Sequence, residues 1–139
     1  MGHAQSSVRC LEDKAAALDA GLSTLLLDLN RRGLLNETLV VLASEFGRSP
    51  EVKAGRIGRD HHPSSFSALL AGGGVKEGYV HGKSDERAHY VEENGVGMEE
   101  LNATIAHAMG ISVNKTIFSP GGRPFKVSHG AQPILDILA

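Results

Sequence analysis

An apolar run at residues 38–43, which reads TLVVLA, constrains the fold of this chain more than any other segment. Its length and its β-branched and aliphatic side chains are typical of a buried strand in a parallel sheet that is covered on both faces. A helical pattern precedes the run, and only a short loop at residues 33–37 joins the two. The sequence therefore predicts an α/β fold, with a mainly parallel sheet flanked by helices.

The helical pattern covers residues 6–32, where apolar side chains recur at steps of three and four residues. They are Leu11, Ala15, Leu18, Leu22, Leu25 and Leu29. Ser6 or Ser7 can cap the start of this helix, and Gly33 ends it. One face of the helix is therefore expected to pack on the sheet, and the opposite face to meet water.

Two further elements follow the central run. Residues 65–71 read as a second buried strand, which ends at three glycines. Glycines after a strand can form a phosphate-binding loop, but no Lys-Ser or Lys-Thr pair follows, so a tight turn is predicted. A second helix is expected at residues 98–109, with Leu101, Ile105 and Ala108 on its buried face and Gly110 after its end.

The composition indicates a single domain at residues 1–139. The net charge of -2 arises from 14 basic and 16 acidic side chains that are interspersed along the chain, which argues against a nucleic-acid or membrane-surface partner. Neither an apolar run of transmembrane length nor a signal peptide is found. Cys10 is the only cysteine, so the chain cannot form an internal disulfide.

Polar side chains that suit a binding site cluster in two loops after the central run. Glu45 and Arg48 follow the predicted strand directly, where open α/β sheets bind their ligands. Arg59, Asp60 and His61 lie together in the next loop, before His62-Pro63. Carboxylates and imidazoles are metal ligands, and guanidinium groups bind anions. The two loops therefore predict a metal ion that faces an anionic substrate, although each Arg could instead form a structural ion pair with its neighbouring carboxylate.

The same motifs resemble a known family. The segments EFGR at residues 45–48, GRDH at 58–61, LAGGG at 70–74 and SDE at 84–86 look, in this order, like a sulfatase-like bacterial family of unknown function. That family is a branch of the alkaline phosphatase and sulfatase superfamily. The resemblance covers nearly the whole chain and implies part of an alkaline phosphatase-like fold, from the C-terminal portion of a longer sulfatase-like protein.

The resemblance also implies roles for individual residues. In the superfamily, divalent metal ions, often zinc, bind a phosphate or sulfate ester. By position, Glu45 and His61 match metal ligands, and His3 matches a histidine of an upstream metal motif. Phe46 stands where relatives have another ligand.

Two functions from different classes follow. The first is metal-assisted hydrolysis of an anionic ester, with Glu45, Asp60 and His61 near the metal and with Arg48 and Arg59 as anion clamps. The alternative is a catalytically inactive binding or assembly module that retains the fold. Because the strand at residues 38–43 has no upstream strand to flank it in this chain, a homo-oligomer is also expected.

Overall fold

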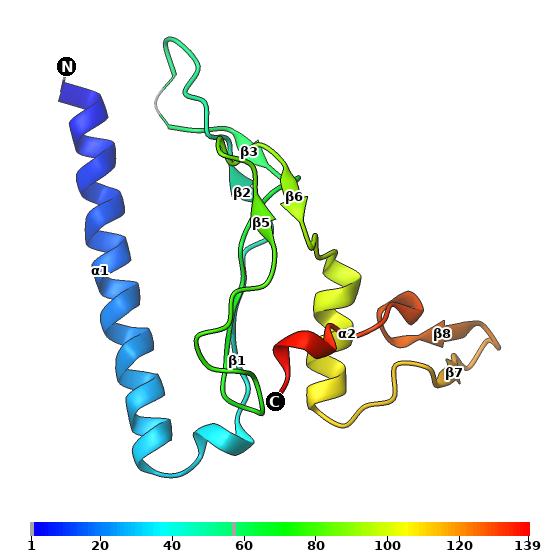
Figure 1. Ribbon diagram of the computed structural model, residues 1–139. Helices are drawn as coiled ribbons and strands as arrows, with labels where there is room; N and C mark the ends of the chain where they lie inside the picture. The colour runs from blue at the N-terminus through cyan, green and yellow to red at the C-terminus, as the bar shows by residue number, and fades with distance from the viewer. Residues whose placement is uncertain (1, 57) are drawn as a thin grey trace.

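The computed structural model describes residues 2–56 and 58–139, and side chains from residue 10 onward. Figure 1 shows a long N-terminal helix on one side, an extended antiparallel arm in the middle, and a C-terminal unit built around a second helix. The helices are α1 (Gly2–Arg31) and α2 (Met98–Ala108), with short 3₁₀ helices η1 (Leu35–Glu37), η2 (Val127–Gly130) and η3 (Leu135–Ile137). The strands are β1 (Val40–Leu42), β2 (Gly47–Arg48), β3 (His61–His62), β4 (Leu69–Ala71), β5 (Lys83–Ser84), β6 (Val91–Glu93), β7 (Thr116–Phe118) and β8 (Pro124–Lys126).

Helix α1 forms where the leucine spacing predicts a helix, but its apolar face is not buried. Leu22, Leu26 and Leu29 are half-buried, whereas Leu18 and Leu25 are 51% and 46% exposed. The helix ends with Gly33 in the left-handed region, at φ 70°, as the sequence predicts. The prediction that α1 packs on a sheet is therefore wrong for this chain, because the described residues form no broad sheet to receive it.

The arm consists of nested antiparallel pairs. Strand β1 pairs with β4, in the register Val40↔Ala71, and the intervening β2 pairs with β3. All strand pairs within residues 2–56 and 58–139 are antiparallel and two-stranded. The predicted parallel α/β sheet is therefore wrong. A parallel pair needs a crossover connection, usually a helix, whereas here the chain between β1 and β4 folds back on itself as β2 and β3.

The small core of the chain lies at α2. Helix α2 buries Leu101, Ala103, Thr104 and Ala106, and the cluster of Ala103, Ala106 and Val113 is covered by Val127 and Ala131. The predicted helix is confirmed, but its buried face is rotated, since Ile105 and Ala108 are only half-buried. At its start, the Glu100 carboxylate accepts a hydrogen bond from the Gly97 N–H.

Thr104 ties the C-terminal segment to α2. Its side chain is fully buried, and its hydroxyl donates to the Glu100 carbonyl oxygen at 2.7 Å. The same hydroxyl oxygen accepts a hydrogen bond from the Ile134 N–H at 2.8 Å. One side chain therefore satisfies a backbone donor that lies thirty positions away in the sequence.

Replacing Thr104 with valine is expected to destabilise the protein. Thr104→Val keeps the side-chain shape but leaves the partly buried Ile134 N–H unpaired, which costs about 1–3 kcal/mol. Urea denaturation measures the loss, and hydrogen exchange should show an unprotected Ile134 amide. Thr104→Ser is the control, because it keeps the hydroxyl. Equal protection of Ile134 in both variants would contradict this role of Thr104.

Candidate functional site

The two loops predicted to form the site do meet, across the β2–β3 pair. Arg48 lies opposite His61 and Gly47 opposite His62, and the Ser49 N–H donates to the Asp60 carbonyl oxygen at 2.9 Å. The close approach depends on Gly47. A Cβ atom at this position would collide with the Ser65 carbonyl oxygen, so the glycine in EFGR is explained by backbone packing.

Phe46 organises the side chains on this ladder. Its ring stacks on the His61 imidazole, with the ring centroids 3.7 Å apart and the planes 22° apart. The Arg48 guanidinium lies 5.5 Å from the Phe46 ring centroid, within the range of a cation–π contact. Phe46 therefore contacts one predicted metal ligand, His61, and one predicted anion clamp, Arg48.

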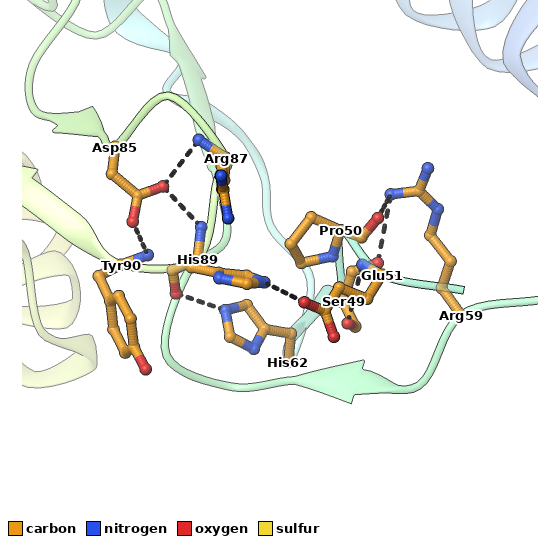
Figure 2. A network of polar contacts seen from close by, with 9 residues as sticks. All are labelled: Ser49, Pro50, Glu51, Arg59, His62, Asp85, Arg87, His89 and Tyr90. Carbon is orange, nitrogen blue, oxygen red and sulfur yellow. Dashed lines mark hydrogen bonds and ion pairs between the residues drawn. The ribbon is translucent and has the colours of Figure 1, made fainter. Parts of the chain in front are cut away.

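The two arginines brace the backbone of the loop. Arg48 Nη1 donates to the Arg59 carbonyl oxygen at 3.2 Å. Arg59 Nη1 donates to the carbonyl oxygens of Ser49 and Pro50 at 3.2 and 3.0 Å, as Figure 2 shows for Arg59. Both side chains are exposed, and each guanidinium has further N–H donors, so an anion clamp stays a prediction for Arg48 and Arg59.

Asp60 is held by two cations of the same loop. Its carboxylate oxygens lie 2.6 Å from Lys53 Nζ and 2.9 Å from Arg56 Nη1. The Lys53 ammonium, through its hydrogen bond and its charge, holds the pKa of Asp60 below its usual value, and Arg56 acts in the same direction. The pair that the sequence suggested, Arg59 with Asp60, is replaced by these two ion pairs.

The predicted metal ligands do not fit a metal centre in this arrangement. Asp60 is engaged by cations, the His61 ring stacks on Phe46, and the Glu45 side chain is exposed. In the part of the chain that the structure describes, no group of three or more His, Cys, Asp or Glu side chains could hold a metal ion. The His3 side chain lies outside the described residues. Zinc binding therefore stays a prediction from the sequence, without geometric support.

A polar network that the sequence does not reveal links the arm to the turn between β5 and β6 (Figure 2). His62 Nε2 lies 2.6 Å from the His89 carbonyl oxygen, and His89 Nε2 lies 3.7 Å from Glu51 Oε1. His89 is an isolated histidine in the sequence, and the pattern around it predicts no role for it. The separation of 27 residues between His62 and His89 leaves no local signal of this contact.

Asp85 shapes the turn that carries His89. One carboxylate oxygen accepts hydrogen bonds from the N–H groups of Arg87 and His89 at 3.0 and 2.9 Å, and the other accepts from the Tyr90 N–H at 3.1 Å. These hydrogen bonds favour the ionised carboxylate. They therefore lower the pKa of Asp85, and the bond from the His89 N–H has the largest effect. The SDE motif at residues 84–86 therefore contributes a turn-forming carboxylate.

Acid is expected to loosen this turn. Because the folded pKa of Asp85 is below its unfolded value of about 3.9, the carboxylate contributes stability above that pH, and the contribution is lost as pH falls through the folded pKa. The amide NMR shifts of His89 and Tyr90, followed from pH 6 downward, should change together as the pH falls through the folded pKa of Asp85. Asp85→Asn should abolish the transition. Wild-type amide shifts that stay constant over the same range would contradict the assignment.

Comparison with known families identifies the chain. A family model described as "Protein of unknown function (DUF1501)" matches residues 3–138. The chain belongs to this family. Comparison with curated proteins found no match, and neither did comparison with solved structures. The family covers all of the loops described above, so the two arginines, Asp60 and the histidine network are parts of a DUF1501 domain.

This match corrects the resemblance drawn from the sequence. DUF1501 membership gives no indication of a relationship to sulfatases or to the alkaline phosphatase superfamily, so that assignment was wrong. The motifs that carried it have local explanations: Gly47 permits backbone contact and Phe46 stacks on His61. In the described residues, no helix is long and apolar enough to cross a membrane.

Proposed function

We propose that this DUF1501 chain is an assembly module that binds a second copy of itself through the apolar face of α1. The observation that carries the proposal is the exposure of that face. Leu11, Leu18 and Leu25 lie on it at intervals of seven residues, and all three are exposed. Single exposed leucines are normal on protein surfaces, but a continuous apolar row along one helix is typical of an interaction site.

The total accessible surface supports this proposal. The chain exposes 10491 Å² for a mass of 14.7 kDa. A compact monomer of this mass exposes about 6,900 Å², so the chain exposes roughly 3,500 Å² more than a compact fold does. A standard interface buries about 800 Å² on each partner. The excess is therefore more than sufficient for a stable interface.

Helix energetics point in the same direction. Helix α1 has 30 residues and is about 45 Å long. Helices in water gain most of their stability from packing of an amphipathic face, rather than from intrinsic propensity. Here the face is half-buried at best, so the contacts that stabilise α1 must come largely from outside this chain. A second α1 offers the same apolar row.

Sedimentation velocity tests the proposal directly. At tens of micromolar the chain should sediment as a dimer or a larger species, and dilution should release monomer. A single monomeric species across this range would overturn the proposal. Far-UV circular dichroism in parallel shows whether α1 is folded, since a helix stabilised by association should lose signal on dilution.

Metal-assisted hydrolysis of an anionic ester stays a prediction, with Arg48 and Arg59 as its anion-binding groups. It is distinguished from assembly by a zinc titration. A melting temperature that rises with zinc, and that no longer rises in His61→Ala, would support a metal site at the β2–β3 pair. An unchanged melting temperature would count against it.

A further inference from the structure

The apolar row of α1 follows a heptad pattern. From residue 11 to residue 29 the apolar side chains are spaced by four, three, four, three and four residues. This is the alternation of d and a positions in a coiled coil, in which two helices pack knobs into holes. Leu11, Leu18 and Leu25 take the d positions, and Leu22 and Leu29 take a positions, with Ala15 at the remaining a position.

The exposure of these side chains matches one continuous seam. The d residues are the more exposed, with Leu11 at 69%, and the a residues Leu22 and Leu29 are half-buried. Figure 1 shows α1 separated from the arm and joined to the rest of the chain at its C-terminal end, next to η1. A second helix can therefore approach the d edge without displacing a packed core.

Charges beside the seam favour a parallel arrangement. Lys14 occupies a g position and Asp19 the following e position, which is five residues later. In a parallel pair, the g position of one helix faces the next e position of its partner, so each Lys14 lies opposite the partner copy's Asp19 and two such ion pairs form per dimer. Both side chains are exposed.

An antiparallel pair is electrostatically worse. In an antiparallel pair that buries the same leucines, the e positions of the two helices face each other, so Asp19 faces Asp19 of the partner copy. They also bring Lys14 toward Asp28, but Asp28 already pairs with Arg32 at 3.2 Å within its own helix. The parallel arrangement forms two ion pairs and brings no like charges together among the described e and g positions.

We propose that α1 forms a parallel, in-register, two-stranded coiled coil with α1 of a second copy, specified by the Lys14 and Asp19 pairs. This inference rests on the proposed assembly function and adds its geometry. It fixes which residues meet: each d leucine contacts the same leucine of the partner copy. That identity between facing residues is what an experiment can detect.

Disulfide cross-linking tests the register. In a Cys10→Ser background, Leu11→Cys should cross-link to its own copy under mild oxidation, because facing d positions bring the two Cα atoms within disulfide reach. In an antiparallel pair the two positions would be far apart. The matched control is Leu27→Cys, on the opposite face of α1, which should cross-link only at background level.

Charge reversal gives a second measurement that does not change the leucines. Lys14→Glu should raise the dimer dissociation constant roughly 3- to 30-fold, since two exposed ion pairs become repulsive. Adding Asp19→Lys should restore wild-type affinity. A dimer without a Leu11→Cys cross-link, or without rescue by the double variant, would overturn the parallel geometry and leave the assembly function standing. A monomeric wild-type chain would overturn both.

Discussion

Replacing Leu18 and Leu25 with glutamate is expected to convert the associated protein to monomer. Leu18 and Leu25 are 51% and 46% exposed, so burying the exposed part of one side chain contributes about 0.7–1.5 kcal/mol. Each dimer would lose four such contributions, roughly 3–6 kcal/mol in total, which corresponds to a dissociation constant at least about 10²-fold higher. Four carboxylates without partners would add a desolvation cost. Sedimentation velocity at micromolar concentration measures the change.

The control for this variant places the same charges on the opposite face of α1. Ala20→Glu with Leu27→Glu adds two carboxylates at positions that point away from the heptad seam, and both wild-type residues are exposed. This variant should remain associated. If both double variants dissociate alike, net charge rather than the seam controls association. If neither dissociates, the interface lies elsewhere, for example on the edge of β1.

The sequence predicts helix α1 but places its start at Ser6 or Ser7 instead of Gly2, and it predicts the environment of the helix incorrectly. The spacing of Leu11, Leu18 and Leu25 reports that a helix has an apolar face, because the helical period fixes which residues share a face. It carries no information about what covers that face. A sheet, a second helix or another copy all satisfy the same pattern. The proposed partner rests instead on the exposure of the leucines and on the charges of Lys14 and Asp19.

The antiparallel pairing of the strands could not be predicted from the sequence for a similar reason. Short apolar runs occur in buried parallel strands, but three-residue strands such as β1 and β4 are too short for alternation to be visible. The deciding feature lies between them. Residues 43–56 and 58–68 form a nested hairpin instead of a crossover helix, and the non-periodic, polar composition of this segment was the available signal.

The candidate site shows the same division. The sequence predicts that the two loops share one site, and the structure places them in one hairpin, where Arg48 Nη1 donates to the Arg59 carbonyl oxygen. The bond between His62 and the His89 carbonyl depends on how the β5–β6 turn meets the arm. Local propensity does not encode such long-range contacts.

Gly72→Ala is expected to be among the most damaging single substitutions in the arm. Gly72 has a φ of 72°, and a Cβ atom there would collide with the backbone oxygens of Leu35 and Thr38. The left-handed conformation costs about 1–2 kcal/mol for alanine, and overpacking adds about 1–3 kcal/mol. The adjacent hydrogen bond from the Gly73 N–H to the Leu35 carbonyl oxygen, at 2.9 Å, should weaken as well.

Gly74→Ala separates the two contributions. Gly74 also has a positive φ, of 83°, but a Cβ atom there meets nothing within 4 Å. It should therefore cost only the conformational term, about 1–2 kcal/mol, whereas Gly72→Ala should cost about 2–5 kcal/mol. Urea denaturation at one fixed protein concentration compares the two, because association shifts apparent stability. Equal losses would show that the glycine turn is needed for its backbone conformation alone, and that the contact of Gly72 with Leu35 and Thr38 is loose.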